Sequence, residues 1–337
     1  MNFQNLTVVE KAQNYLDNAF RAGQQAVMRM KSKKSLFRTK SPFEKTKAIE
    51  IERMQVVKNS IYNSFSTILK SFPTISNLPT FYYELTKITL DYYILKKSLG
   101  TLNWGREKAD ELARIYTPKI KGSRDFKQLE KARREFFGRL SSIVYQMDKA
   151  LNYLEQARKT MKEFPTVKTE TKTIALVGFP NVGKTTLLFK MTGSQPEISD
   201  YAFTTKRINI SYYKHNNERI QVMDTPGTLN RFAKMNMIEK QAYLAMKYCA
   251  DIFVYVFDLS EPYPFKEQEK LFKSLTAFKK PIIVYFSKQD ILPPELMEKQ
   301  MKKYKGISDF VLLKEKLAVL MSSVRPKISD NATENSN

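Results

Sequence analysis

A glycine-rich segment in the middle of the chain constrains its fold more than any other feature. Residues 178–186 are Gly-Phe-Pro-Asn-Val-Gly-Lys-Thr-Thr, which fits the pattern GxxxxGK[ST], and they lie between an apolar run and a helix-forming run. In such a segment the glycines let the backbone wrap around phosphate groups, while amides at the start of the helix point at the phosphate oxygens. The segment therefore predicts a phosphate-binding loop between a buried strand and a helix.

Each position of this loop has an expected role. Lys184 is expected to bridge the β- and γ-phosphates of a nucleotide, and the Thr185 hydroxyl to bind Mg²⁺. Further nucleotide contacts are expected from Gly178, Phe179, Pro180, Asn181, Val182, Gly183 and Thr186. An ordinary glycine-rich turn is the alternative, and the flanking strand and helix disfavour it.

Two later segments complete the expected phosphate and metal site. Asp224-Thr225-Pro226-Gly227 follows an apolar run, so Asp224 would hold the metal through water and the Gly227 amide would face the γ-phosphate. Between this segment and the loop, Thr205 is expected to close onto Mg²⁺ when a γ-phosphate is present, with Thr204 as the alternate. A Thr-Thr pair that simply favours a β-strand is the alternative interpretation.

The base is expected to be recognised by Ser287-Lys288-Gln289-Asp290, where Asn-Lys-x-Asp would select guanine. Asp290 can accept two hydrogen bonds from guanine, which adenine does not offer, and the Lys288 stem can lie over the ring. Ser287 has no side-chain amide, so we expect GTP over ATP with weakened affinity. Ser308 is a candidate for a further base contact, and a solvent-facing turn serine is an equal alternative.

A change in the spacing of apolar residues divides the chain into two regions. After residue 172, short β-rich runs alternate with helical ones at 173–177, 207–213, 219–223, 252–257 and 281–286, which predicts a mostly parallel sheet flanked by helices over 173–325. A hairpin turning at 215–218 would be its antiparallel pair. We expect 164–172 to be a linker and the polar tail 326–337 to be disordered.

Residues 1–163 have apolar positions spaced three and four apart, which predicts an antiparallel helical bundle. Helix breaks are expected at Pro42, around Pro73 to Pro79, between Gly100 and Gly105, and at Gly122. The run from Phe136 onward predicts one long helix ending near residue 161.

The ordered motifs resemble those of a TRAFAC-class GTPase, and in detail those of the Nog family of ribosome-assembly GTPases. The resemblance rests on Gly-Phe-Pro-Asn-Val-Gly-Lys at 178–184, Tyr-x-Phe-Thr-Thr-Lys at 201–206, Asp-Thr-Pro-Gly at 224–227, Asp-Leu-Ser-Glu at 258–261, and Phe-Tyr-x-Glu-Leu at 81–85 in the helical half. It implies a helical bundle ahead of a P-loop G domain, Mg²⁺-dependent hydrolysis of GTP to GDP, and association with the maturing large ribosomal subunit through rRNA. The long C-terminal extension of eukaryotic members is lacking, so we expect a compact, archaeal-type member.

Two further positions depart from many GTPases. Thr228 stands where a glutamine often orients the attacking water, so intrinsic turnover is expected to be slow. Asn181 is the residue type that coordinates K⁺ in cation-dependent relatives, where the ion supplies the charge of an arginine finger. An asparagine that only stabilises the turn of the loop is an equal alternative.

The formal net charge is +23, and up to Glu170 there are 32 basic and 17 acidic residues, against 25 and 17 beyond it. This asymmetry predicts that the helical half binds a polyanion. The densest cluster, expected to contact rRNA, consists of Lys31, Lys33, Lys34, Arg38 and Lys40. A second cluster, for which a merely solvated surface is an equal interpretation, consists of Lys127, Lys131, Arg133, Arg134 and Arg139.

Composition excludes several classes of protein. One cysteine and one histidine exclude a disulfide framework and a multi-ligand Cys or His metal centre. We expect a soluble cytoplasmic protein, nucleolar only if eukaryotic, that is monomeric away from the ribosome and binds no membrane.

The rival function is a weakly hydrolysing or non-hydrolysing, nucleotide-sensing RNA-binding scaffold, which Ser287 and Thr228 favour. A GTPase at a membrane surface is the weaker alternative.

Overall fold

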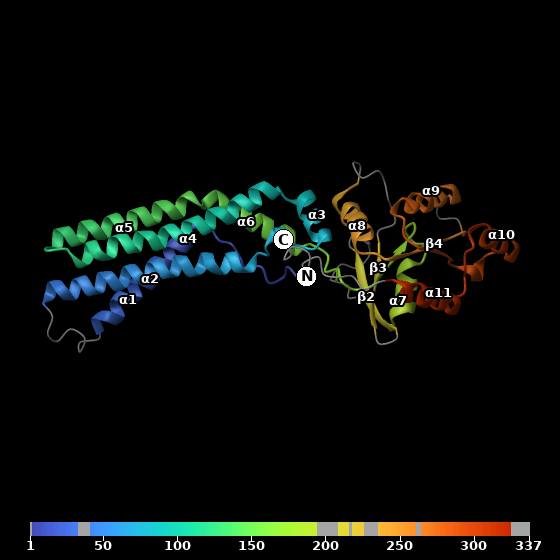
Figure 1. Cartoon of the computed structure of the whole chain (residues 1–337), viewed down its shortest axis with the longest axis horizontal. Coiled ribbons are helices and arrows are strands. Elements are labelled where there is room, and N and C mark those ends of the chain that lie inside the picture. Colours follow the sequence, from blue (N-terminus) through green and yellow to red (C-terminus); the bar gives the residue numbers. More distant parts are fainter. Residues whose placement is uncertain are drawn as a thin grey trace, which may run out of the picture. The chain divides into compact units, whose positions relative to one another are not determined.

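The computed structural model describes residues 2–32, 41–193, 208–215, 218–225, 235–260 and 264–324. The chain divides into two compact units, which are labelled by element in Figure 1. The helical unit comprises residues 2–75 and 86–164, and the sheet unit comprises residues 76–85 together with the chain from Pro165 onward. The expected tail at 326–337 lies outside the described residues.

The helical unit confirms the predicted antiparallel bundle. Its long helices are α1 (Ala12–Ser32), α2 (Pro42–Ser71), α4 (Tyr92–Lys121), α5 (Phe126–Gln146) and α6 (Asp148–Lys162), and α3 (Thr80–Thr89) is divided between the two units. Within the bundle α2 packs between α1 and α4, and α4 also packs on α5 and α6 (Figure 1).

Local sequence explains why these helices begin and what they bury. Ser41 and Glu44 form a reciprocal capping box at the start of α2, where Pro42 fits the first turn. Val57, Ile61 and Phe65 then recur every four residues and are buried, so one face of α2 enters the core.

Two predicted features of the bundle are wrong. The break expected between Gly100 and Gly105 is absent, because α4 runs through both residues. A Cβ on Gly105 would come within 2.0 Å of the Met147 sulfur, so this glycine allows a close packing contact and is not a helix breaker. The single helix expected from Phe136 onward is interrupted at Met147, where α5 ends and α6 begins.

The sheet unit confirms the predicted α/β architecture. Its strands are β1 (Thr173–Val177), β2 (Asn209–His215), β3 (Glu218–Asp224), β4 (Ile252–Phe257) and β5 (Ile282–Phe286). They are ordered β2-β3-β1-β4-β5, and all neighbouring pairs are parallel except β2 with β3, which is the predicted hairpin. The carboxyl ends of β1, β3, β4 and β5 therefore lie along one edge of the sheet.

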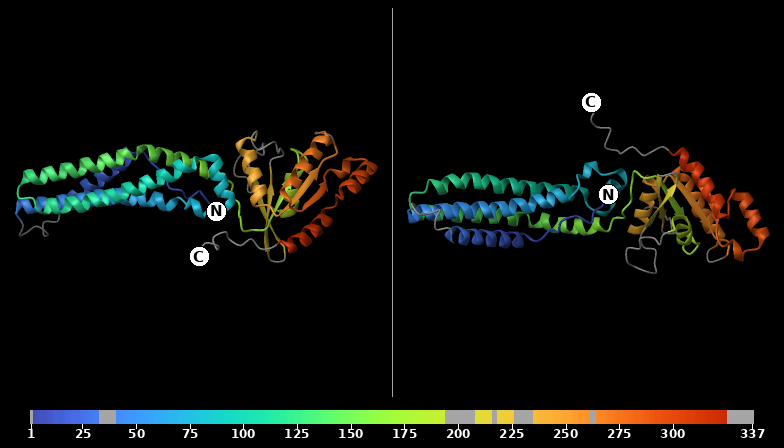
Figure 2. Two further views of the ribbon diagram at one scale, coloured as in Figure 1. Left: turned by 45° about the horizontal axis from the view of Figure 1, so that its top comes forward. Right: turned by 90° about the horizontal axis from the view of Figure 1, so that it is seen from below.

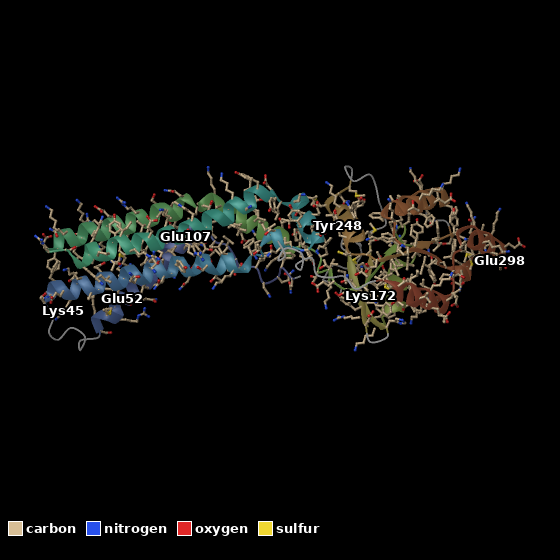
Figure 3. The ribbon with its side chains drawn as sticks, in the orientation of Figure 1. Lys45, Glu52, Glu107, Lys172, Tyr248 and Glu298 are labelled. Carbon is tan, nitrogen blue, oxygen red and sulfur yellow. The ribbon has the colours of Figure 1, made fainter. Side chains whose placement is uncertain are left out.

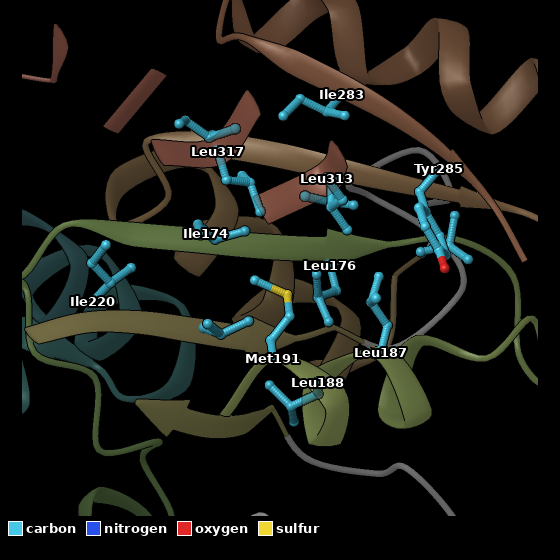
Figure 4. Close-up of a cluster of buried hydrophobic side chains, with 14 of the residues drawn as sticks. Ile174, Leu176, Leu187, Leu188, Met191, Ile220, Ile283, Tyr285, Leu313 and Leu317 are labelled. Atoms are coloured by element: carbon cyan, nitrogen blue, oxygen red, sulfur yellow. The ribbon is translucent and has the colours of Figure 1, made fainter. Parts of the chain in front are cut away.

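Alternating side chains give the sheet two buried faces. On one face, Ile174 and Leu176 of β1 pack with Leu188 of α7 (Lys184–Thr192) and Leu317 of α11 (Phe310–Ser323) in an aliphatic cluster (Figure 4). On the other, aromatic side chains of β4 contact aromatic residues of α9 (Phe265–Leu275) and α10 (Pro294–Tyr304). Helix α8 (Met237–Tyr248) also belongs to this unit, and the helices flank the sheet in Figure 2. Such burial on both faces is typical of parallel sheets.

The segment before β1, expected to be a linker, is bound to the sheet unit. The Val167 N–H donates to the Tyr82 hydroxyl at 2.9 Å, and the Lys168 N–H donates to Gln221 Oε1 of β3 at 3.0 Å. Tyr82 and Gln221 are fully buried. These bonds fix the direction in which the chain enters β1.

Candidate nucleotide-binding site

The loop between β1 and α7 has a backbone that only particular residues can adopt. A Cβ on Gly178 would lie 2.5 Å from the Val256 carbonyl oxygen, so no other residue fits there without a shift. Gly183 has φ 93° and precedes α7 without a side-chain cap, which leaves the first amides of the helix for an anion. Asn181 has φ 62° and is exposed. That left-handed backbone favours asparagine in a turn.

Lys184 occupies the centre of this loop. Its side chain is buried, and Nζ donates to the carbonyl oxygens of Gly178 at 2.9 Å and Phe179 at 2.7 Å. Burial lowers the pKa of this lysine, and the charge of Asp224 opposes the shift. Both bonded partners are uncharged carbonyls, so these bonds do not neutralise the positive charge of the ammonium group.

Thr185 and Asp224 form the adjoining metal-binding candidate. Thr185 Oγ1 donates to Asp224 Oδ2 at 2.7 Å, which joins the start of α7 to the end of β3. Asp224 Oδ1 is buried and has no hydrogen-bond partner among the described residues. Burial raises the pKa of Asp224, opposed by the charge of Lys184 and by the side-chain hydrogen bonds of Thr185 and Asn209. A buried carboxylate oxygen without a partner beside a hydroxyl group fits a hard cation such as Mg²⁺.

The other expected phosphate-side residues differ in exposure. Thr186 is exposed, Phe179 and Pro180 are half-buried, and Val182 is buried in the aliphatic cluster. Thr225 is buried, and its Oγ1 donates to the Leu176 carbonyl at 2.8 Å, so it fixes the chain after β3 against β1. Thr204, Thr205, Pro226, Gly227 and Thr228 lie outside the described residues.

The expected base-recognition residues follow β5 at the same edge of the sheet. Ser287 and Lys288 are half-buried, and Asp290 is exposed in the short helix η5 (Gln289–Ile291). Ser308 follows Ile307, whose N–H donates to Val284 and whose carbonyl accepts from Phe286. This pairing places the half-buried Ser308 near the end of β5.

Sequence reasoning missed the residues that support this loop. Lys288 forms an ion pair of 2.6 Å with Asp258, which follows β4, and Asp258 also accepts hydrogen bonds from Ser260. Gln268 of α9 binds both the N–H and the carbonyl of Asp258. The Asp-Leu-Ser-Glu motif at 258–261 was the available signal, although it gave no indication of these partners.

Of the expected RNA-binding residues, the structure describes one, at the end of α1. Lys31 is exposed at the end of α1, whereas Lys33, Lys34, Arg38 and Lys40 lie outside the described residues. Lys45, in the first turns of α2, is labelled in Figure 3.

The second basic cluster, on α5, is partly engaged in ion pairs. Arg134 pairs with Glu130 at 2.6 Å, and Arg133 pairs with Glu50 at 3.5 Å. Lys127 and Lys131 are exposed. Arginines already bonded to carboxylates are less available to phosphates, so part of this cluster is engaged within the protein.

A mostly parallel sheet with a P-loop after its central strand and a buried aspartate after the neighbouring one is the G domain of a P-loop GTPase. Comparison with protein families agrees, since residues 173–288 match the family described as 50S ribosome-binding GTPase. Residues 3–168 match the NOG1 N-terminal helical domain. The chain therefore belongs to the Nog1 family of ribosome-binding GTPases.

Individual relatives show how much of the chain is shared. An uncharacterized protein of Methanocaldococcus jannaschii is 33% identical over 297 residues, which cover 87% of this chain and 82% of that protein. Nucleolar GTP-binding protein 1 of Drosophila melanogaster is 30% identical over 302 residues, 87% of this chain and 45% of that one. The chain thus spans less than half of the fly protein.

Among solved structures, one of Era in complex with MgGDPNP and nucleotides 1506–1542 of 16S ribosomal RNA is 25% identical to the matched region. The match covers 48% of this chain and 59% of that one, with a TM-score of 0.37. Within the described ranges of the present chain, no helix is both long and apolar enough to cross a membrane.

Proposed function

We propose that the chain binds GTP and hydrolyses it to GDP and phosphate, as a switch in the assembly of the large ribosomal subunit. The observation that carries this proposal is the position of Lys184 and the Thr185–Asp224 pair at the start of α7. A buried ammonium group, uncapped helix amides and a buried carboxylate with an unpartnered oxygen suit a Mg²⁺–triphosphate group.

In this proposal each residue of the phosphate end has one task. Lys184 holds the β- and γ-phosphates, and the amides from Gly183 onward bind phosphate oxygens. Thr185 and Asp224 would hold Mg²⁺, Asp224 through water, and the bound ion would offset the charge that develops on the phosphates. Thr205, or Thr204, and Gly227 would sense the γ-phosphate, as the family resemblance implies.

At the base end, Asp290 accepts hydrogen bonds from guanine and the Lys288 stem covers the ring. The exposure of Asp290 leaves its carboxylate accessible to a base. Because Ser287 supplies no amide, the affinity for GTP is lower than an asparagine would allow. The exocyclic amino group and N1–H of guanine still select it over adenine.

Turnover is proposed to be slow, because Thr228 is too short to orient water in the manner of glutamine. Potassium bound near Asn181 would supply positive charge to the reaction. The left-handed backbone of Asn181 is the competing explanation for this residue. Parallel turnover measurements in KCl and NaCl decide between them, since equal rates would remove the potassium role.

The helical unit is proposed to bind rRNA of the maturing particle, with hydrolysis timing its release. Support comes from the excess of basic residues before Glu170 and from the match to the NOG1 N-terminal helical domain. Electrostatic binding to phosphates should fall steeply as salt rises. Cosedimentation with ribosomal subunits and with anionic liposomes across a salt series distinguishes RNA from a membrane surface.

Single-turnover hydrolysis tests the enzymatic part of the proposal. Purified protein in excess over GTP and Mg²⁺ should release phosphate slowly, and should leave ATP intact under the same conditions. Equal binding of ATP and GTP would contradict guanine selection. If GTP is bound but not cleaved, even on ribosomal subunits, the second candidate applies, a nucleotide-sensing RNA-binding scaffold favoured by Ser287 and Thr228.

A further inference from the structure

The loop after β5 is bound to the end of β4 by three contacts. The backbone N–H and the Oγ of Ser287 both donate to the Phe257 carbonyl, at 2.9 and 3.1 Å. Lys288 Nζ lies 2.6 Å from Asp258 Oδ2. The two residues at the start of the base-recognition loop are thus anchored to two consecutive residues of a neighbouring strand end.

Asp258 is itself held firmly. Its side chain is fully buried, and Oδ1 accepts hydrogen bonds from the N–H and the Oγ of Ser260 at 2.9 and 2.6 Å. The buried Gln268 side chain binds the N–H of Asp258 at 3.0 Å and its carbonyl at 2.7 Å. Burial would raise the pKa of Asp258, but the bonds from Lys288 and Ser260 outweigh it and lower the pKa. Asp258 therefore presents a fixed negative charge to the lysine.

Lys288 spans the distance between this charge and the loop. Its φ is 52°, a left-handed backbone that side chains seldom adopt, and a third of its side chain stays exposed. A lysine stem fixed at both ends loses its freedom to rotate before any ligand arrives, so less entropy is lost when a flat base packs on it.

We propose that Asp258 is a positioning residue for base recognition, which holds the Lys288 stem in place through their ion pair and so compensates for the amide that Ser287 lacks. The inference rests on the proposed binding of a guanine nucleotide at this loop. Asp258 touches no part of the nucleotide in this account, and it acts only through Lys288. Its loss should therefore weaken binding at the base end and leave the phosphate chemistry unchanged.

The expected loss of nucleotide affinity depends on the fraction of molecules in which the Lys288 stem is already in place. If an unanchored stem is in place in about one molecule in ten, the apparent affinity falls about tenfold. Asp258→Asn keeps the shape and the bond from Ser260 but removes the charge. We expect about tenfold faster release of a fluorescent GDP analogue, with single-turnover hydrolysis at saturating GTP unchanged within about twofold.

A double-mutant cycle separates positioning from general damage. Lys288→Met keeps an unbranched stem but cannot pair with Asp258, so it should weaken GDP binding as much as Asp258→Asn. The double variant should be no weaker than either single one, because both remove the same interaction. Lys288→Arg retains the ion pair and should bind GDP more tightly than Lys288→Met. Thermal melting of each variant reports whether it is folded.

Glu218→Gln is the matched control, because it removes an ion pair of 2.8 Å with Lys172 at the opposite end of β3. It should leave GDP release unchanged. Wild-type release rates in Asp258→Asn, or additive losses in the double variant, would overturn the inference and leave the proposed function standing. If Asp258→Asn does not fold, equal affinities of the Lys288→Met and Lys288→Arg variants would overturn it. Failure of the wild-type chain to bind GTP would instead overturn the proposed function.

Discussion

The two units of this chain differ in how far their proposed functions depend on single residues. In the sheet unit a few residues are tied to one position: the Gly178 backbone passes too close to the Val256 carbonyl for a Cβ, and Lys184 binds the loop carbonyls. The helical unit has a buried core of ordinary helical spacing, and the sequence up to Glu170, with 32 basic and 17 acidic residues, carries most of the net charge of +23. Phosphate recognition by a loop therefore depends on single residues, whereas binding of a long polyanion is shared among many.

The largest expected effect is the loss of GTP affinity when Lys184 is removed. This variant also tests whether nucleotide binding depends on one residue of the loop. Loss of a buried charge that pairs with phosphate costs about 3 kcal/mol or more, which is a decrease of about 100-fold in GTP affinity for Lys184→Ala. RNA binding by nucleotide-free protein should not change. Titration with fluorescent GTP and filter binding with rRNA measure the two affinities.

The control for that experiment is Lys190→Ala, since Lys190 is exposed on the same helix. It should bind GTP as the wild type does. Comparable losses of GTP affinity in the two variants would show that overall charge, rather than the loop, attracts the nucleotide.

The next largest effect is expected from the first basic cluster, which extends from Lys31 to Lys40 in the sequence. Alanine at Lys33, Lys34 and Arg38 should lower RNA affinity about tenfold at physiological salt and reduce the salt slope by about three, one for each lost phosphate contact. GTP affinity should stay the same. An equal change of charge in the sheet unit, with alanine at Lys299, Lys302 and Lys316, is the control. Equal RNA losses in the two triple variants would contradict a specific role for the helical unit.

One aspartate in each unit has a shifted pKa, and the two shifts have opposite directions. Replacing each aspartate by asparagine should therefore change the free energy of unfolding in opposite directions. Burial raises the pKa of Asp224, so the folded state loses stability as the pH rises above the ordinary carboxyl pKa, and the loss is complete once the pH exceeds the raised value. Asp224→Asn should therefore increase the free energy of unfolding of nucleotide-free protein by about 1–2 kcal/mol near neutral pH. The gain should shrink as the pH falls and vanish below about 3.9, where the carboxyl is protonated in both states. The same variant should lose Mg²⁺-dependent nucleotide binding.

Asp110 in the helical unit should show the opposite sign. A hydrogen bond from Lys58, at 3.0 Å, lowers the pKa of Asp110, so its ion pair stabilises the fold above the ordinary pKa and is lost as the pH falls through the lowered value. Asp110→Asn should be destabilising at neutral pH, by less than about 1 kcal/mol for a partly exposed pair. Urea unfolding of both variants from acid to neutral pH measures these differences. Stabilisation by Asp110→Asn, or destabilisation by Asp224→Asn, would contradict the assigned causes.

The smallest expected effect concerns the base end of the site. Ser287→Asn restores the side-chain amide, and one added hydrogen bond of about 0.7 kcal/mol corresponds to about threefold tighter GTP binding. Ser287→Ala, which removes the bond to the Phe257 carbonyl, should bind no more tightly than the wild type. Competition with unlabelled GTP resolves a difference of this size. Weaker binding by Ser287→Asn would indicate that the loop has no room for the larger side chain.

The sequence predicted most of what depends on local pattern. The five strands were predicted from short β-rich runs, and the P-loop was predicted because an apolar run, the glycines and a lysine are adjacent in the chain. Gly105 was misinterpreted because its reason is the sulfur of Met147, which lies 42 positions away. Asp258, Gln268 and Lys288 were not linked for the same reason: their contacts join three elements that only the folded sheet brings together.

Ribosome binding in two nucleotide states tests the central claim most directly, because a switch requires that GTP and GDP favour different affinities for the partner. The wild-type chain would be sedimented with large ribosomal subunits in the presence of Mg²⁺ and either a non-hydrolysable GTP analogue or GDP. The account predicts about tenfold tighter binding with the GTP analogue, within the usual range of coupling energies. Equal affinity in the two states would contradict it.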